Sequence, residues 1–473
     1  MNPQAPAGTA RGAAGTHAMG RRAFLGVELS AGGVALAAGA AAGCQLAGGQ
    51  RSAGPGAGPA GASARPGGCG PVAGASRQLR GAWVASFKHL DWPSRPGLPA
   101  AAAQRELAGL LDLAARLRLN AVLLQVRPTA DALYPSRYEP WSKWLTGTQG
   151  TSPGYDPLEF AVNAAHDRGL ELHAWFNPFR VSEQPGRSRL TAAHPARQHP
   201  DWVVPYAGQL WYDPGHPAVR ALAVDVIAEV TRGYDIDGVH LDDYFYPYPA
   251  GGLAFADDAT FRRYGGGFAS RGDWRRHNVD LLVAAVSATV RNIRPWAVFG
   301  VSPFGIWRNA SADPAGSRTT GLQAYDDLFA DTLGWIRAGL LDYVAPQLYW
   351  EMTNPRAPYQ ELVRWWSRAV TGTPAQLYAG QAAYLAAAWP DPGEIPRHVA
   401  FDRSEPAVTG ELFFHARSLA TGALGVRLAG EFASAAYPPV PQRLRRWLRA
   451  PQPPPRAGWA HRDKIACAAG GTT

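Results

Sequence analysis

The chain has 473 residues, 46% of them hydrophobic, and it contains 17 Trp, 17 Tyr and 16 Phe. This composition excludes an intrinsically disordered protein and allows one large domain with aromatic side chains left over for a binding cleft. The formal net charge of +9 favours acidic surroundings, but the basic residues are spread along the chain and no nucleic-acid-binding motif accompanies them, which indicates a diffuse basic surface.

Residues 1–44 have the features of an export signal. The run Gly20-Arg-Arg-Ala-Phe-Leu25 resembles a twin-arginine signal. The apolar run after it is shorter than the ~20 residues that span a bilayer, and it ends in Ala41-Ala-Gly-Cys44, which resembles a lipoprotein cleavage box. We therefore predict cleavage before Cys44, acylation of its thiol and a lipid-anchored protein of the cell envelope, at the periplasmic or outer-membrane face. Cleavage to a soluble exported protein is the alternative, because Ala41 stands where such boxes usually have a larger apolar residue.

Two further segments lie outside the predicted domain at 77–436. Residues 45–76 have the Gly, Ala, Pro and Ser content of a flexible linker, and residues 437–473 form a Pro-rich C-terminal tail. The three cysteines, Cys44, Cys69 and Cys467, all fall in these terminal segments, so the sequence supports neither a disulfide framework nor a cysteine metal site. With Cys44 acylated, a bridge between Cys69 and Cys467 remains open.

From Arg80 onward, short apolar strands alternate with longer amphipathic helices. Strands are predicted at residues 81–87, 120–126, 171–176, 238–242, 298–302, 343–349, 376–380 and 410–414. Helices are predicted at residues 102–117, 157–168, 218–232, 279–292, 327–338 and 359–370, with a long excursion before residue 218. Repeated βα units of this kind predict an α/β fold, a (β/α)8 TIM-type barrel with long βα loops. A doubly wound nucleotide-binding sheet fits less well, because Lys88-His-Leu-Asp-Trp-Pro93 stands where its Gly-rich loop is expected.

The most informative strand end is Asp237-Gly-Val-His-Leu-Asp-Asp-Tyr-Phe-Tyr-Pro247, where Asp242 and Asp243 lie among aromatic residues. Carboxylates act as nucleophile, acid or base at glycosidic bonds, and aromatic rings stack on sugars, so this pair indicates sugar chemistry. Side chains alternate along a strand, so His240, Asp242 and Tyr244 share a face. The alternative is that Asp242 pairs with Arg127 or His240 and only closes the barrel.

Two resemblances extend this interpretation. Asp237-Gly-Val-His-Leu-Asp242 has the spacing of the fourth-strand motif of the α-amylase clan, whose last Asp is the nucleophile, although His240 stands where that clan has Arg. Seven segments also occur in order: Arg80-Gly-Ala-Trp83 with Asp91-Trp-Pro93, Gln125-Val-Arg-Pro128 with Asp131-Ala-Leu-Tyr-Pro-Ser136, Ala174-Trp-Phe-Asn-Pro178, Asp213-Pro-Gly-His-Pro217, His240-Leu-Asp-Asp-Tyr-Phe-Tyr-Pro247, Ser302-Pro-Phe-Gly-Ile-Trp-Arg-Asn309 and Ala345-Pro-Gln-Leu-Tyr-Trp350.

These segments are similar to those of glycosyl-hydrolase-like family ten, the group of DigH-type bacterial lipoproteins. The resemblance implies a (β/α)8 barrel related to the α-amylase clan, in an exported or surface-attached protein. It also implies a glycan substrate, in particular peptidoglycan strands stripped of their stem peptides. We therefore expect an exported glycoside hydrolase that needs no cofactor.

Asp242 is the predicted nucleophile. The proton donor stays open, because the fifth strand, where the α-amylase clan places a Glu, ends in Val301-Ser-Pro-Phe-Gly305 without a carboxylate. Asp243, Asp131 and Glu351 are the candidates, in that order. A proton donor at neutral pH needs a raised pKa, and the negative charge of Asp242 would raise the pKa of the adjacent Asp243.

Further side chains at the strand ends are predicted to bind substrate. They would form hydrogen bonds to sugar hydroxyls or N-acetyl groups, or stack on sugar rings. These residues are Arg127, His173, Trp175, Asn177, His240, Tyr244, Trp307, Gln347, Tyr349 and Trp350.

No metal is predicted, because no ligand spacing supports one. Two other functions stay open: a glycan-binding lipoprotein that has lost its acid, and a metal-dependent deacetylase of cell-wall sugars. The oligomeric state is not predicted.

Overall fold

The computed structural model describes residues 78–420 and 423–433. The predicted export signal, linker and C-terminal tail, with Cys44, Cys69 and Cys467, lie outside these residues and stay predictions.

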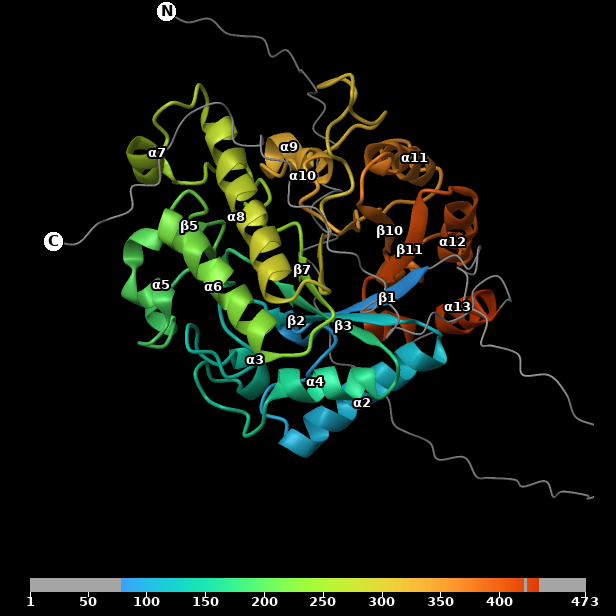
Figure 1. Cartoon of the computed structure of the whole chain (residues 1–473), viewed down its shortest axis with the longest axis horizontal. Helices are drawn as coiled ribbons and strands as arrows, with labels where there is room; N and C mark the ends of the chain where they lie inside the picture. Colours follow the sequence, from blue (N-terminus) through green and yellow to red (C-terminus); the bar gives the residue numbers. More distant parts are fainter. Residues whose placement is uncertain (1–77, 421–422, 434–473) are drawn as a thin grey trace, which may run out of the picture. The chain divides into compact units, whose positions relative to one another are not determined.

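Within the described residues, eight parallel strands close into a barrel (Figure 1). The hydrogen-bonded order is β1-β2-β3-β7-β8-β9-β10-β11, and β11 returns to β1 with Leu79 opposite Gly410. The (β/α)8 prediction is confirmed. The strands are β1 (Leu79–Val84), β2 (Ala121–Arg127), β3 (Glu171–Phe176), β7 (Gly238–Leu241), β8 (Val298–Val301), β9 (Tyr343–Val344), β10 (Gln376–Gln381) and β11 (Val408–Phe413).

Helices between these strands cover the outside of the barrel (Figure 1). Helix α4 illustrates why they begin where they do: the Asp156 side chain accepts hydrogen bonds from the amides of Leu158 and Glu159, and Pro157 occupies the first turn. The main helices, one after each barrel strand, are α2 (Ala100–Arg116), α4 (Pro157–His166), α6 (Pro217–Gly233), α8 (Arg271–Ile293), α10 (Thr332–Arg337), α11 (Tyr359–Val370), α12 (Glu394–Ser404) and α13 (Leu424–Phe432). Additional helices are α3 (Lys143–Thr146), α5 (Pro195–Gln198), α7 (Asp258–Tyr264) and α9 (Ala324–Asp327), and single 3₁₀ turns are η1 (Phe87–His89), η2 (Arg187–Arg189), η3 (Pro200–Trp202), η4 (Ala383–Leu385) and η5 (Ala416–Leu419).

The long excursion between β3 and α6 forms a small antiparallel sheet that the sequence analysis did not predict. Its strands are β4 (Arg180–Ser182), β5 (Val203–Tyr206) and β6 (Gln209–Tyr212), in the order β4-β6-β5. A two-residue turn joins β5 to β6, and its residues Ala207 and Gly208 both have positive φ, of 47° and 77°. Such turns match the twist of a hairpin. The sheet holds Arg180 close to the end of β3.

The structure differs from the predicted elements elsewhere as well. β9 ends at Val344, five residues before the predicted end, because Pro346 has no amide N–H for the ladder. The chain nevertheless stays beside its neighbours, since Gln347 forms isolated bridges with Phe304 and Gly380. The helix predicted at 327–338 is divided into α9 and α10, and α12 and α13 were not predicted.

The barrel interior holds aromatic and polar side chains rather than aliphatic ones alone. Trp83, Trp175 and Tyr343 point into the barrel interior. They belong to a buried hydrophobic cluster that is separate from the larger cluster packed between the strands and the outer helices. Gly300 makes room for this layer, because a Cβ there would lie 2.2 Å from the ring of Tyr343. The hydroxyl of Tyr343 consequently reaches the centre of the barrel, below the end of β7.

Candidate active site

Asp242 and Asp243, here called the acid pair, follow β7 at the C-terminal end of the barrel. Both side chains are buried, with 4% and 2% of their surface exposed. A buried carboxylate needs hydrogen-bond donors or positive charge around it. The two carboxyl groups obtain these donors from different parts of the barrel.

Asp242 is held from the side of β3. Its Oδ2 accepts hydrogen bonds from Trp175 Nε1 at 3.1 Å and Asn177 Nδ2 at 2.9 Å, and its Oδ1 accepts one from the Tyr244 amide at 3.2 Å. Trp175 is in β3, the neighbour of β7, and Asn177 directly follows that strand. These donors stabilise the ionised form of Asp242 and fix its orientation.

Asp243 turns the other way. Gln347, which follows β9, donates from Nε2 to Asp243 Oδ1 at 2.9 Å and to the Ser302 carbonyl at 3.1 Å. The hydroxyl of Tyr248, five residues along the same loop, donates to Asp243 Oδ2. The acid pair therefore diverges, with Asp242 anchored towards β3 and Asp243 towards β8 and β9.

Burial and mutual repulsion favour a proton on the acid pair. Burial raises the pKa of Asp242 above the usual carboxyl range, and the charge of Asp243 raises it further. Burial also raises the pKa of Asp243, while the hydrogen bonds from Tyr248 and Gln347 oppose that rise. The Arg180 guanidinium, which lies 4.0 Å from the ring centroid of Phe87 and 5.0 Å from that of Tyr244, favours ionisation of both carboxyls. One carboxylate and one carboxylic acid is the combination that glycoside hydrolysis requires.

Partly exposed aromatic side chains surround the acid pair, and we call them the aromatic rim. Tyr244 contacts Tyr248, with ring centroids 5.4 Å apart, and Tyr248 contacts Phe304 at 6.1 Å. Tyr349 lies on the other side of the acid pair. Burial raises the pKa of the Tyr349 hydroxyl most, and Tyr384 and the nearby charge of Asp243 raise it further. The rim offers apolar faces around two acidic groups, which suits a sugar. Its members are Phe87, Tyr244, Tyr248, Phe304, Tyr349, Trp350, Tyr384 and Phe414.

His173 and His240 form a buried layer beneath the acid pair. Tyr343 joins them, because its hydroxyl lies 3.0 Å from His173 Nδ1 and 2.9 Å from His240 Nδ1. His240 Nε2 also lies 2.9 Å from Ser302 Oγ. Burial lowers the pKa of His240 well below its ordinary value, so this ring is neutral. The floor of the site therefore has the neutral His240 at the position where the α-amylase clan has an arginine.

Arg127 and Asp131, both after β2, have partners away from the acid pair. Arg127 is buried, donates to Glu139 Oε2 at 2.7 Å, and donates from Nη1 to the carbonyls of Asn177 and Pro178 at 2.6 and 2.9 Å. It therefore fixes the backbone that presents Asn177 to Asp242. Asp131 is fully buried and accepts hydrogen bonds from Thr129 at 3.0 Å and Gln149 at 3.3 Å, and burial raises its pKa to about 6.

Trp307 and Glu351 complete the predicted site residues. Trp307 is buried and stacks on Trp365 of α11 with ring centroids 5.7 Å apart, so it packs against the outer helices. Glu351 lies in the loop from β9 to α11, where its backbone carbonyl accepts from the amides of Asn354 and Tyr359. The structure thus brings together Asp242, Asp243, Trp175, Asn177, Tyr244, Gln347, Tyr349 and Trp350, with His173 and His240 below them.

Six residues belong to the site but were not among the predicted site residues: Phe87, Arg180, Tyr248, Phe304, Tyr384 and Phe414. Tyr248 follows the acid pair closely, in Tyr246-Pro-Tyr-Pro249, and this proximity was the available signal. Tyr384 lies beyond β10 and Phe414 directly after β11, at strand ends from which no site residue was predicted.

The described part of the chain has neither a cluster of metal ligands nor a membrane-spanning helix. No group of three or more His, Cys, Asp and Glu side chains within residues 78–420 and 423–433 is arranged to hold a metal ion. Over the same residues, no helix combines the length and the apolar character that crossing a bilayer requires.

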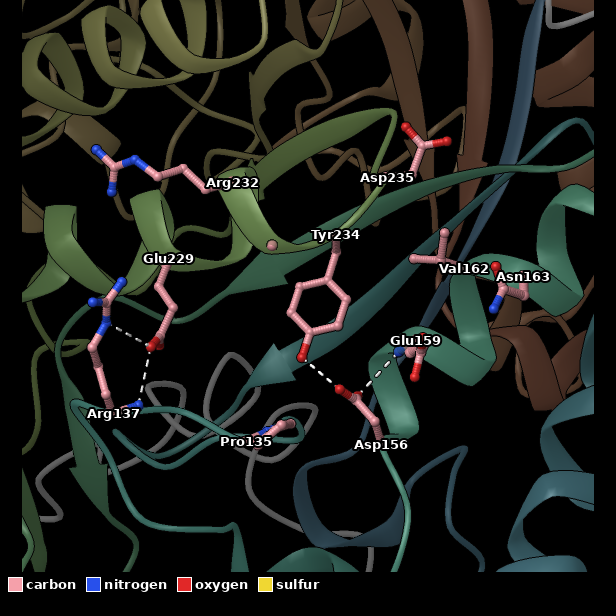
Figure 2. A pocket seen from close by; sticks show the side chains of 11 residues that line it. Pro135, Arg137, Asp156, Glu159, Val162, Asn163, Glu229, Arg232, Tyr234 and Asp235 are labelled. Carbon is pink, nitrogen blue, oxygen red and sulfur yellow. Dashed lines mark hydrogen bonds and ion pairs between the residues drawn. The ribbon is translucent and has the colours of Figure 1, made fainter.

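A pocket of about 580 Å³ lies outside the acid pair, between α4, α6 and the loop after β2 (Figure 2). Tyr234 donates to Asp156 across it at 2.6 Å, and Arg137 Nε lies 3.3 Å from Glu229. No residue of the acid pair or the aromatic rim lines this pocket. Asp156 and Glu229 are already bound to other residues of the pocket, and the buried acid pair lies elsewhere, so the sugar chemistry is assigned to the barrel end instead.

Comparison with known proteins agrees with this geometry. The family model described as "Glycosyl hydrolase-like 10" matches residues 78–390. The chain belongs to the glycosyl hydrolase-like 10 family. It is 46% identical to glycosyl hydrolase YngK of Bacillus subtilis (strain 168) over 363 residues, which cover 75% of this chain and 71% of that protein. It is 41% identical to glycosyl hydrolase DigH of Escherichia coli (strain K12) over 366 residues, which cover 72% of this chain and 83% of that protein.

Among solved structures, the glycoside hydrolase domain of PgaB (BpsB) from Bordetella bronchiseptica is similar, with a TM-score of 0.47 and 15% identity over 74% of this chain and 98% of that one. The acid pair and the aromatic rim of this glycosyl hydrolase-like 10 protein lie within the matched residues, except for Phe414. The family and the barrel together support a glycoside hydrolase that acts on carbohydrate.

Proposed function

We propose that this protein hydrolyses glycosidic bonds in a glycan of the cell envelope, most specifically peptidoglycan strands that lack stem peptides. The observation that carries the proposal is the buried acid pair beneath a rim of partly exposed aromatic rings. Paired carboxyls can exchange one proton with the substrate, and the rings can hold sugar faces.

The two carboxyls take different roles in this proposal. Asp242 is the anionic member, because Trp175, Asn177 and the Tyr244 amide all donate to it, and it supports attack on the anomeric carbon. Asp243 is the proton donor to the leaving oxygen, because burial raises its pKa beside an anionic neighbour. Gln347 and Tyr248 orient that donor.

The choice of an envelope glycan rests on the family resemblance and on the N-terminal sequence. The resemblance implies peptidoglycan strands without stem peptides, and residues 1–44 predict export with a lipid anchor on Cys44. The formal net charge of +9 suits association with an anionic polymer or membrane surface. A lipid-anchored enzyme would meet its substrate in the envelope.

Product analysis on purified peptidoglycan, with and without prior amidase treatment, tests both the reaction and the substrate. The proposal predicts new reducing ends, formed faster on amidase-treated material. A soluble glycan such as starch is the negative substrate. Equal rates with and without amidase would contradict the preference for stripped strands, and no reducing ends on either material would contradict hydrolysis.

Two other functions give different products in the same assay. A metal-dependent deacetylase would release acetate and stop with a chelator. A glycan-binding lipoprotein would sediment with the polymer and release neither product. Hydrolysis is favoured over binding alone because two adjacent buried carboxyls with raised pKa are costly for the fold, and such perturbed groups cluster at catalytic sites.

A further inference from the structure

The divergence of the acid pair limits how it can act on a sugar. A retaining hydrolase with an enzyme nucleophile places its two carboxyls about 5–5.5 Å apart on opposite sides of the anomeric carbon. Asp242 and Asp243 are instead consecutive residues at one strand end, with Asp242 held by Trp175 of β3 and Asp243 by Gln347, which follows β9 on the other side of β7. Both carboxyls therefore approach the substrate from the same strand.

The hydrogen bonds that Asp242 already receives make its carboxylate better suited to accept one more hydrogen bond than to attack carbon as a nucleophile. Oδ2 receives both the Trp175 and the Asn177 donor, which occupy its two lone pairs. Oδ1 receives the Tyr244 amide, so among the described residues it retains room for one further donor. Each donor stabilises the carboxylate charge and so weakens its attack on carbon, while the remaining position suits an N–H group.

Asp91 and Asp131, two other acids at the strand ends, already have partners of their own. Asp91 accepts from the Ala85 amide at 2.8 Å and the Arg417 amide at 2.7 Å, and it lies 2.7 Å from His415 Nδ1. Asp131 is fully buried with Thr129 and Gln149 as partners. Neither Asp91 nor Asp131 is therefore free to face Asp242 across a sugar as a second carboxylate.

We propose that the substrate supplies its own nucleophile, the carbonyl oxygen of a 2-acetamido group, and that the site consequently requires N-acetylated amino sugars. The inference rests on the proposed hydrolysis and deepens it by naming the reacting group of the substrate. Asp242 accepts the acetamido N–H on Oδ1 and holds the group beneath the anomeric carbon.

The steps balance without any cofactor. The acetamido oxygen forms a bond to the anomeric carbon while the bond to the leaving oxygen breaks, and Asp243 gives its proton to that oxygen. The bicyclic intermediate carries a positive charge shared with nitrogen, which Asp242 stabilises through the N–H or by taking that proton. Water then attacks the anomeric carbon, Asp243 takes one proton from it, and the acetamido group is restored with retention of configuration.

Amidase-treated glycan strands in three forms test this inference with the unmodified full chain. One portion is chemically de-N-acetylated, a second is de-N-acetylated and then re-N-acetylated as the matched control, and a third is N-trifluoroacetylated to make the carbonyl oxygen a poorer nucleophile. We expect the free-amine strands to react at least ~10³-fold more slowly, since the intramolecular nucleophile is lost. Re-acetylation should restore the rate, and the trifluoroacetyl strands should react at least ~10-fold more slowly than the control.

The outcomes separate this inference from the proposed function. Equal cleavage of the acetylated and free-amine strands would overturn the inference and leave hydrolysis standing. No cleavage of any form would overturn both. With Asp242→Ala, azide should not restore the rate, and formation of a glycosyl azide of inverted configuration would show that Asp242 itself is the nucleophile and would also overturn the inference.

Discussion

Tyr248→Phe tests whether Asp243 is the proton donor. Burial raises the pKa of Asp243, and the hydrogen bond from the Tyr248 hydroxyl opposes that rise. A hydrogen bond to a charged group contributes about 1.5–3 kcal/mol, and one pKa unit corresponds to about 1.4 kcal/mol. Removing the hydroxyl should therefore raise the pKa of Asp243 by about one to two units. Because the donor acts in its protonated form, the alkaline limb of kcat/KM should move to higher pH by the same amount.

The assay is reducing-end release from amidase-treated strands, followed from acidic to alkaline pH. Phenylalanine keeps the ring contacts of Tyr248, whose centroid lies 5.4 Å from Tyr244 and 6.1 Å from Phe304. Tyr246→Phe is the matched control, since the Tyr246 hydroxyl has no hydrogen-bond partner among the described residues. An alkaline limb that stays in place in Tyr248→Phe, while Tyr246→Phe behaves as wild type, would refute the assignment of Asp243.

Two stability predictions follow from other buried groups. Arg127→Met should lower the melting temperature, because it leaves the Glu139 carboxylate buried without its partner, at a cost of about 3–5 kcal/mol; an unchanged transition would show that Glu139 finds other donors. Burial raises the pKa of Asp402 to about 8 from its ordinary 3.8, so the folded state holds this proton more tightly than the unfolded state does. The free energy of unfolding should therefore fall as pH rises between these values, and Asp402→Asn should make that fall smaller by the part that Asp402 contributes. Urea unfolding at several pH values measures it, and parallel pH dependences for both proteins would contradict the prediction.

The sequence was sufficient for the barrel because its strands are short, apolar and separated by amphipathic helices. The predicted third strand, 171–176, coincides with β3, and the helix predicted at 359–370 coincides with α11. Such periodic segments carry their own signal, since both faces of each strand are buried. The sheet of β4, β5 and β6 has strands of only three or four residues, one of them containing Pro205, and offers no such pattern.

Within the site, the sequence located the acid pair but not its surroundings. Asp242 and Asp243 stand next to each other in the chain, whereas their donors Trp175 and Gln347 are 67 and 104 residues away. Strand order brings these donors to the same end of the barrel, but their pairing with one carboxyl or the other depends on side-chain geometry. The pairing of Arg127 with Glu139 is of the same kind, because it arises from the fold of the loop after β2.

The central claim is that Asp242 supports hydrolysis of a glycan, and Asp242→Asn tests it most directly. Asparagine keeps the size of the side chain but removes the charge that Trp175, Asn177 and the Tyr244 amide stabilise. On amidase-treated peptidoglycan strands, we predict that reducing-end release by the variant falls at least ~100-fold while its melting temperature stays near or above that of wild type. Turnover at the wild-type rate by folded Asp242→Asn would contradict the claim.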